Sequence, residues 1–345
     1  MVPSSVDISP TDLASRPMEI PCAVTIIVPT RNRPGLLARA LAAIHAQSLP
    51  AFEVIVVDDA SSDETRSAYD ALWSQLDSRF RLIQLGNAGG VGAGPSVTRN
   101  TGIAAAHGQI ITFCDDDDFW TSDRHLVSMV EVFSQHPEVD MYIANQQAVS
   151  CEGKVEREDW LPGLVRATRG KAAGPHGHLV SMDDLVRSGG FAQLNILAVR
   201  KQLALDIGCF WTRTTYEEDR DFFWRAADAA RAVFFNPERV AQHNIPDPAG
   251  RNNLSRSFSQ AERWLLSALV SQHIAMSVRH GAIRKLCHAY EGDILRRLSE
   301  HWCQQGKHAL GLQYARRALA ARGSLKWALY TGLLTCRQLG RREVA

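Results

Sequence analysis

The sequence predicts an α/β fold with a mainly parallel sheet, followed by an all-helical region. Between residues 24 and 114, short runs that are apolar throughout alternate with helical patterns, which is typical of strands that helices cover on both faces. From about Ser257 to Arg341 the pattern is helical almost without interruption. We therefore expect a flexible tail over residues 1–21, an α/β domain over 22–255 and a helical region over 256–345.

Four strands and three intervening helices are expected in the first half of the α/β domain. The strands are the apolar runs VTIIV, EVIVV, RLIQL and QIITFC, and breakers or turn residues follow them. The second turn, DDASSDET, contains serines and aspartates that suit a helix N-cap. The strands are expected at 24–28, 53–57, 81–85 and 109–114, and the helices at about 36–47, 65–76 and 98–106.

The second half of this domain is less regular. A helix over 123–136 and a strand over 141–144 come first. The segment 149–190, rich in glycine, charge and histidine, is expected to be a long loop or an insertion near the site. Regular structure resumes over 195–210, and 214–235 has mostly helical spacing.

The bulk composition excludes several classes of protein. With 45% hydrophobic and 22% charged residues the chain is expected to be globular, and a net charge of +1 without a basic patch argues against nucleic acid as a partner. Seven cysteines without a C-x-x-C pair predict reduced, mostly buried thiols, and neither a disulfide framework nor a zinc site. A secretory signal and an apolar run of about 18 residues are both missing, so we expect a cytoplasmic protein.

Four consecutive carboxylates, Asp115–Asp118, follow the fourth expected strand. Their mutual repulsion is unfavourable unless a cation compensates it. Polar clusters also follow the first and second strands. In parallel sheets, ligands bind at the edge formed by the carboxyl ends of the strands. Mg²⁺ and Mn²⁺ prefer carboxylate oxygens, so the D-x-D spacing of Asp115 and Asp117 predicts a site for a metal and a diphosphate. A solvated acidic turn that caps the next helix is the alternative.

Four segments together resemble the family 2 glycosyltransferases, a large, inverting and nucleotide-sugar-dependent family with the GT-A fold. They occur in the expected order and are VTIIVPTRNRPGLLARAL, EVIVVDDASSDET, TRNTGIAAAHGQIITFCDDDDFW and EEDRDFFWR. The resemblance covers about residues 22–255. It implies a Rossmann-like, mixed and mainly parallel sheet with flanking helices, to which the all-helical C-terminal region is an appendage.

The resemblance also implies which residues bind the nucleotide-sugar donor. In the family, the turn after the first strand and the second carboxylate of the DD-x-S segment hold the base, an arginine that matches Arg99 lies near the phosphates, and the first D-x-D carboxylate meets the ribose. Relatives commonly carry an aromatic residue where this chain has Arg31, which leaves the base open, although a UDP-sugar is favoured. A helix-surface ion pair is the other interpretation of Arg99. The implied nucleotide-binding residues are Pro29, Thr30, Arg31, Asp59, Arg99, Asp115 and Asp116.

Metal ligands and a catalytic base are implied as well. Asp117 and Asp115 would hold Mg²⁺ or Mn²⁺, and His243 would ligate the metal or touch a phosphate, unless it is an ordinary loop histidine. The catalytic aspartate of the family aligns with Asp219 in EEDRDFFWR, and its carboxylate would accept the proton of the acceptor hydroxyl. Without the resemblance, the same run is interpreted as an acidic first turn of a helix.

These observations predict a metal-dependent inverting glycosyltransferase. It would move a sugar from a nucleoside diphosphate sugar to a hydroxyl of a glycan, a lipid-linked acceptor or a small molecule, in polysaccharide or other glycan biosynthesis. A sugar-1-phosphate nucleotidyltransferase is one alternative, although PTRNRPG lacks the lysine expected of its activation loop. A non-catalytic scaffold that binds a partner through the helical tail is another.

Other segments carry weaker expectations. GNAGGVGAG (86–94) fits neither a dinucleotide nor a P-loop fingerprint and is expected to be a mobile loop beside the donor. His176 and His178 form H-G-H, a weak metal candidate. In the tail, 260–286 combines an apolar stripe with basic residues, which is compatible with a homodimer, another protein partner or peripheral contact with the inner face of the cell membrane. Residues 302–323 resemble half of a tetratricopeptide repeat, for which a packed helical appendage is the favoured interpretation.

Overall fold

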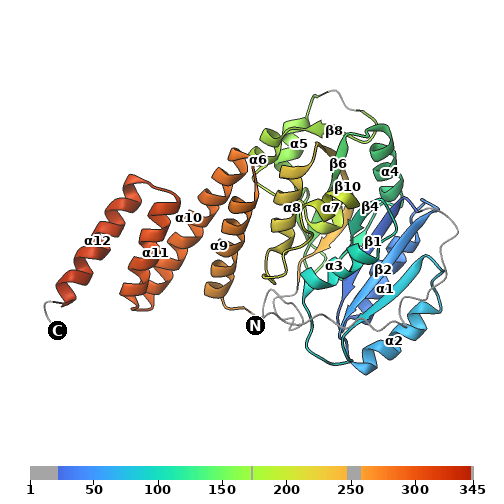
Figure 1. Cartoon of the computed structure of the whole chain (residues 1–345), viewed down its shortest axis with the longest axis horizontal. Helices are drawn as coiled ribbons and strands as arrows, with labels where there is room; N and C mark the ends of the chain where they lie inside the picture. The colour runs from blue at the N-terminus through green and yellow to red at the C-terminus, as the bar shows by residue number, and fades with distance from the viewer. Residues whose placement is uncertain (1–21, 172–173, 247–257, 343–345) are drawn as a thin grey trace. The chain divides into compact units, whose positions relative to one another are not determined.

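The computed structural model describes residues 22–171, 174–246 and 258–342 (Figure 1). The flexible tail expected over 1–21 lies outside these residues. The described chain divides into two compact units, which we call the sheet unit and the helical unit. The sheet unit holds the described residues of Met1–Thr212 and Ala229–Asp247, and the helical unit holds those of Arg213–Asp228 and Pro248–Ala345.

The sheet unit is built on one sheet with the strand order β3-β2-β1-β4-β9-β6-β10-β5, in which β7 pairs with β6 and β8 with β10. Neighbours among β1 to β4 are parallel, as are β6 and β10, whereas β9 runs antiparallel between β4 and β6. The sheet is therefore mixed, as expected. The strands are β1 Val24–Thr30, β2 Phe52–Asp59, β3 Phe80–Leu85, β4 Ile110–Phe113, β5 Phe119–Trp120, β6 Val139–Val149, β7 Val155–Arg157, β8 His178–Val180, β9 Leu197–Arg200 and β10 Ala232–Asn244.

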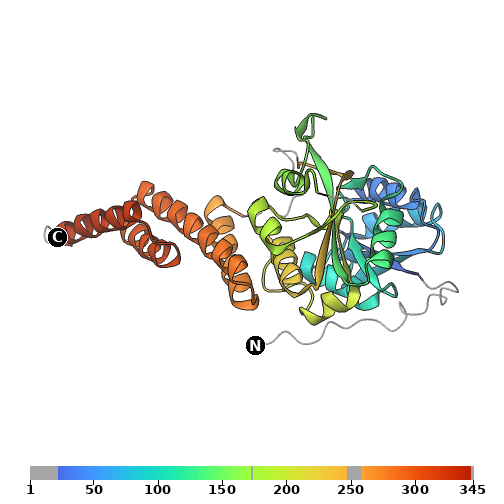
Figure 2. The ribbon, with the colours of Figure 1, turned by 90° about the horizontal axis from the view of Figure 1, so that it is seen from above.

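Helices cover both faces of this sheet (Figure 2), which explains why β2 and nearly all of β1 are buried along their whole length. The expected cap at the second turn is present, because the Ser62 side chain accepts a hydrogen bond from the Thr65 N–H at 3.3 Å. The helices of this unit are α1 Pro34–His45, α2 Asp63–Trp73, α3 Pro95–Ala105, α4 His125–Gln135, α5 Pro162–Thr168, α6 Met182–Ser188, the short 3₁₀ helix η2 Leu194–Ile196 and α7 Lys201–Asp206.

Two expectations for this region are wrong. The segment 149–190 is not one long loop, because it contains β7, α5, β8 and α6. The helix expected across 214–235 ends early: α8 spans Glu218–Ala229, and the run AVFF begins β10, which pairs in parallel with β6. A short run of apolar residues fits a buried strand as well as a buried helix, and the neighbouring strand decides between them.

The helical unit consists of α8 with α9 Gln260–Ser277, α10 Gly281–Gln304, α11 His308–Ala321 and α12 Leu325–Arg342. Helices α10 and α11 approach closely, since a Cβ on Gly311 would lie 2.4 Å from the Cys303 sulfur. Trp327 of α12 packs into the same core and donates from Nε1 to the Ala315 carbonyl at 2.9 Å. Small and aromatic side chains thus set the helix spacing, as the sequence suggested.

No helix in the described part of the chain combines the length and the apolar character that crossing a bilayer requires. All seven cysteines are free thiols, as expected. The expectation that most are buried is only partly right, because Cys151 and Cys336 are exposed and two others are half-buried.

Candidate active site

Most of the nucleotide- and metal-binding residues that the sequence singled out lie at the carboxyl edge of the sheet. Thr30 ends β1, Asp59 ends β2 and the four aspartates follow β4. These strands are parallel neighbours, since β1 pairs with both β2 and β4, so their carboxyl ends meet at one edge. The turns after β1 and β2 contain left-handed non-glycine residues, Asn32 at φ 54° and Ala60 at φ 59°. Such strained backbone is concentrated at functional sites.

The four aspartates alternate between half-buried and buried. The side chains of Asp115 and Asp117 are 33% and 31% exposed, whereas those of Asp116 and Asp118 are 6% and 4% exposed. The half-buried pair has the predicted D-x-D spacing. The buried pair is tied into the protein, so the run is not a uniformly solvated acidic turn.

Asp116 is held by the turn after β1. Its carboxylate accepts from Thr30 Oγ1 at 2.8 Å and from the Arg33 guanidinium at 3.1 Å, and Arg33 also reaches Asp117 at 3.0 Å. Burial raises the pKa of Asp116 to about 7, and repulsion from Asp117 adds to the rise, while Arg33 and Thr30 oppose it. Arg33 is therefore the counter-charge of two aspartates, a role that the sequence analysis missed.

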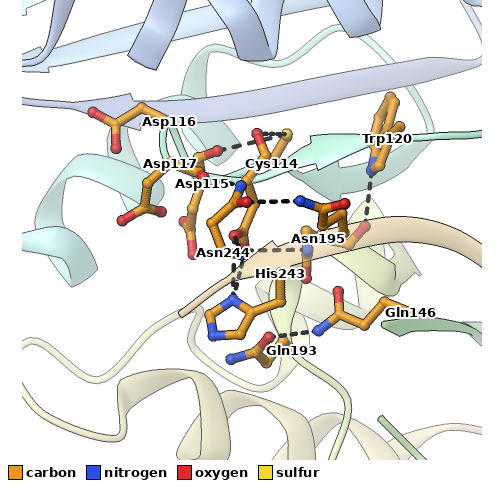
Figure 3. Close-up of polar contacts among 12 residues, drawn as sticks. Cys114, Asp115, Asp116, Asp117, Trp120, Gln146, Gln193, Asn195, His243 and Asn244 are labelled. Carbon is orange, nitrogen blue, oxygen red and sulfur yellow. Dashed lines mark hydrogen bonds and ion pairs between the residues drawn. The ribbon is translucent and has the colours of Figure 1, made fainter. Parts of the chain in front are cut away.

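Asp118 is the structural member of the run. Its carboxylate accepts from the Asn244 N–H at 2.7 Å, His243 Nδ1 at 3.0 Å and Asn195 Nδ2 at 3.2 Å. Figure 3 shows His243, Asn244 and Asn195 gathered beside the aspartates. Burial lowers the pKa of His243, but the neighbouring aspartates, Asp118 first, outweigh it and raise that pKa overall. With Nδ1 bonded to Asp118, only Nε2 of His243 can bind a metal or a phosphate.

The glycine-rich loop is bonded to both residues that the sequence placed at the base. The Arg31 guanidinium donates to the Gly90 carbonyl at 2.9 Å, and the Asp59 carboxylate accepts from the N–H groups of Ala93 at 2.6 Å and Gly94 at 3.0 Å. A Cβ on Gly92 would lie 2.0 Å from Arg31 Nη1 and 2.6 Å from Asp59 Oδ2. Only glycine fits this approach, so the loop, Arg31 and Asp59 form one arrangement.

Asp58 and Pro29, which precede these residues, have different surroundings. Asp58 is fully buried and bonded to Ser61, Arg66 and Tyr69, so the first carboxylate of the DD pair supports the turn. Pro29 lies half-buried in β1 opposite Val57. The second carboxylate of the pair is the one at the loop, as the sequence analysis expected.

Arg99 joins the cluster from α3. It donates to Asp115 at 2.6 Å, and its guanidinium carbon lies 5.5 Å from the centre of the Phe210 ring. Its side chain is 6% exposed, so this ion pair is not one of the surface pairs of a helix. The site therefore contains two arginines, Arg33 and Arg99, next to the D-x-D carboxylates.

A divalent cation fits this set of donors. Within the part of the chain that the structure describes, no group of three or more histidine, cysteine, aspartate or glutamate side chains is arranged to hold a metal ion. The carboxylate oxygens of the half-buried Asp115 and Asp117 are nevertheless the hard donors that Mg²⁺ and Mn²⁺ prefer. Burial, and then repulsion from Asp115, raises the pKa of Asp117, so a cation at this point would stabilise the charged form.

Asp219, the predicted base, belongs to the helical unit. It is half-buried in the first turn of α8, and its Oδ1 accepts from the Arg220 N–H at 2.7 Å. Phe222, Phe223 and Trp224, which follow in the same helix, are buried, as expected of core residues.

The weaker metal candidates have other surroundings. His176 Nε2 lies 2.5 Å from Glu131 Oε2, and His178 lies in β8, where it is opposite Phe235 of β10. Among the residues that sequence reasoning missed, Arg33 had a weak signal as the second arginine of PTRNR. Asn195 and Asn244 had no signal in the sequence, because the fold alone brings them to Asp118 and Asp117, respectively.

Comparisons with known proteins find glycosyltransferases among the relatives. A GalNAc(5)-diNAcBac-PP-undecaprenol beta-1,3-glucosyltransferase of Campylobacter jejuni is 39% identical over 95 residues, which are 28% of this chain and 29% of the relative. The chain matches about a third of the length of the first curated relatives.

Two solved structures resemble the whole fold. S. aureus TarS 1-349 in complex with UDP-GlcNAc aligns with a TM-score of 0.61 at 17% identity, over 86% of this chain and 81% of that chain. The mannosyltransferase PcManGT of Pyrobaculum calidifontis, in complex with GDP-Man and Mn²⁺, aligns with a TM-score of 0.55 at 21% identity, over 98% of this chain and 84% of that chain. The expected GT-A fold with its helical appendage is confirmed.

A family match covers much of the sheet unit. Residues 25–187, which include nearly all of β1, the strands β2 to β8 and all four aspartates, match the family described as Glycosyl transferase family 2. Over this segment, which is just under half of its length, the chain is similar to glycosyl transferase family 2.

Proposed function

We propose that this protein is an inverting, metal-dependent glycosyltransferase that moves a sugar from a nucleoside diphosphate sugar to an acceptor hydroxyl. The observation that carries the proposal is the alternation of the aspartates, which leaves Asp115 and Asp117 only half-buried at the carboxyl edge of the sheet, while Asp116 and Asp118 are buried. The match of residues 25–187 to glycosyl transferase family 2 supports the reaction class. The nucleotide sugars named with the two solved structures support the class of donor.

The donor would lie along the carboxyl ends of β1, β2 and β4. Arg31 and Asp59 would bind the base, with Pro29 and Thr30 beside it. Asp115 would meet the ribose and Arg99 the phosphates. Asp116 is buried, so it would support nucleotide binding indirectly, by holding Thr30 and Arg33 in place. A UDP-sugar is favoured, although the two neighbouring structures hold different bases.

Asp117 and Asp115, with Nε2 of His243, would hold Mg²⁺ or Mn²⁺. The ion neutralises the diphosphate leaving group as the glycosidic bond breaks. On the protein side, the guanidinium groups of Arg33 and Arg99 place positive charge next to both carboxylates and would steady the same diphosphate. The Mn²⁺ complex of the similar mannosyltransferase supports a divalent ion.

Asp219 would be the general base. The acceptor oxygen attacks the anomeric carbon from the side opposite the nucleotide, its proton moves to the Asp219 carboxylate, and the nucleoside diphosphate leaves with the electron pair of the broken C–O bond. The acceptor would be a glycan or a lipid-linked sugar, as in the Campylobacter relative, or a small molecule. We place the reaction in the cytoplasm, at or near the inner face of the cell membrane, in the synthesis of a polysaccharide or another glycan.

A panel of UDP- and GDP-sugars with Mn²⁺ or Mg²⁺ tests the proposal. The full chain should consume one of them and release the free nucleoside diphosphate, slowly with water alone and faster with the acceptor. Asp117→Asn should lower this rate roughly 100-fold or more, because a bound metal contributes several kcal/mol. Asp123→Asn, which removes an exposed carboxylate from the next turn, is the matched control and should leave the rate unchanged. Release of pyrophosphate, or no consumption of any donor, would contradict the proposal.

A further inference from the structure

The start of α8 is bonded to both of the first two helices of the C-terminal region. Glu217, which immediately precedes α8, accepts a hydrogen bond on Oε1 from Ser267 of α9 at 2.8 Å and another from the hydroxyl of Tyr290 of α10 at 3.0 Å. Hydrogen bonds to a carboxylate are stronger than those between neutral groups. Two helices that follow α8 by more than thirty residues therefore converge on one side chain beside the predicted base.

Arg220 strengthens the same junction. Its guanidinium donates to Glu217 Oε2 at 3.2 Å and lies 3.6 Å above the centre of the Tyr290 ring. Arg220 is buried, and a buried charge is tolerated only when it is paired. Tyr290 thus contacts the junction twice, with its hydroxyl on Glu217 and with its ring on Arg220.

Asp221 forms a further attachment, one turn into α8. It is fully buried, and its carboxylate bonds to Arg225 at 2.6 Å and to His273 of α9 at 2.6 Å. At the far end of α8, Asp228 accepts the N–H groups of Arg279 and His280, at 2.8 and 2.7 Å, from the turn between α9 and α10. Helix α8 is therefore fixed to α9 and α10 along its length.

The backbone at the junction is strained. Glu217 has a φ of 56°, which is the left-handed region that non-glycine residues avoid, and its carbonyl accepts the Asp221 N–H at 3.1 Å, the bond that opens α8. A residue in this conformation persists only when its surroundings impose it. The bonds from Ser267 and Tyr290 provide that constraint, and Asp219 lies two residues further on.

We infer that α9 and α10 are positioning elements of the catalytic machinery, and that Ser267 and Tyr290, acting through Glu217, orient the turn that carries Asp219. This inference rests on the proposed role of Asp219 as the base. The residues of this segment that α9 and α10 contact are Glu217, two positions before Asp219, and Arg220 and Asp221, one and two positions after it. All three of these residues, and both helices, lie beyond the segment 25–187 that matches the family.

The test compares the full chain with the variants Ser267→Ala, Tyr290→Phe and their combination. Each substitution removes one hydroxyl and leaves the packing nearly unchanged. Hydrogen–deuterium exchange should become faster in peptides covering residues 214–222 and stay unchanged in α11 and α12. The value of kcat should fall between about 10- and 100-fold, the range that misplaced catalytic groups produce, while the KM for the donor stays within about twofold. Ser267→Thr keeps the hydroxyl and should restore most of the rate.

Tyr314→Phe is the matched control, because it removes a tyrosine hydroxyl from α11, a helix that provides none of the bonds to Glu217, Arg220 and Asp221 given above. Unchanged exchange over 214–222 in the double variant would overturn the inference, and so would faster exchange with a wild-type kcat, because the contacts would then serve folding alone. Asp219→Asn separates the two hypotheses. If that variant is inactive while the double variant is fully active, the base stands and the positioning role fails. If Asp219→Asn is fully active, the proposed base fails, and the inference fails with it.

Discussion

Gly92→Ala perturbs the proposed base-binding residues, Arg31 and Asp59, without replacing either of them. The new methyl group would lie 2.0 Å from Arg31 Nη1 and 2.6 Å from Asp59 Oδ2, well inside van der Waals contact. Both atoms are the ends of side chains, so the clash can be relieved by moving Arg31 and Asp59 and leaving the sheet in place. The expected damage is therefore to nucleotide binding more than to folding.

The size of the effect follows from the bonds that must break. The Arg31 bond to Gly90 is exposed and contributes at most about 1 kcal/mol, whereas each backbone N–H bonded to the buried Asp59 carboxylate contributes about 1.5–3 kcal/mol. If the Arg31 bond to Gly90 and one of the two bonds to Asp59 are lost, the free energy of unfolding falls by no more than about 4 kcal/mol. Since both side chains leave their positions, we expect the dissociation constant for the nucleotide to rise about 10- to 100-fold, or about 1.4 to 2.8 kcal/mol.

Isothermal titration of UDP and of GDP in the presence of Mg²⁺ measures this change. Gly35→Ala is the control, because a Cβ there meets nothing within 4 Å and the residue lies in the first turn of α1. The Gly35→Ala protein should bind the nucleotide with the same affinity as the wild type. A folded Gly92→Ala protein that binds the nucleotide within twofold of the wild type would refute the assignment of Arg31 and Asp59 to the base.

Three further predictions concern stability and the metal. Thr25→Val should lower the free energy of unfolding by about 2–5 kcal/mol in chemical denaturation, because the buried hydroxyl bonds both Glu53 at 2.8 Å and the Gly108 N–H at 2.9 Å; an unchanged midpoint would contradict this reasoning. Trp327→Ala should lower the free energy of unfolding by about 3–5 kcal/mol, so that the helical circular dichroism signal is lost at a lower temperature than in the wild type. Trp327→Phe should lower this free energy by less. Chelation of divalent ions should abolish donor turnover, and added Mn²⁺ should restore it; turnover that persists in chelator would remove the metal from the proposal.

Local patterns in the sequence predicted the first half of the sheet unit well. The strands β1 to β4 are long apolar runs with breakers at their ends, and the expected and observed bounds differ by two residues at most. The D-x-D spacing could also be predicted from the sequence, because the aspartates directly follow an apolar strand and so lie at the carboxyl edge of the sheet. That Asp115 and Asp117 are half-buried while Asp116 and Asp118 are buried follows from the turn geometry, and only the structure shows it.

The remaining features depend on contacts between residues distant in the chain. Arg33 meets Asp116 across 83 positions, and Asn244 meets Asp117 across 127. No local pattern encodes such pairs, because the topology of the sheet brings them together. In the segment 149–190 a local signal did exist: Ser181 and Asp184 form a capping box for α6, in which aspartate takes the place of the usual glutamate. Strand β7 has three exposed residues and no apolar pattern to identify it.

Anomalous diffraction from crystals grown with Mn²⁺ and the tightest-binding nucleoside diphosphate tests the central claim most directly. We predict a manganese peak bonded to the Asp117 carboxylate and to the diphosphate, with Asp115 at the ion or the ribose and the base beside Arg31 and Asp59. A peak bound by other side chains, or a nucleotide bound away from the carboxyl ends of β1, β2 and β4, would contradict the account.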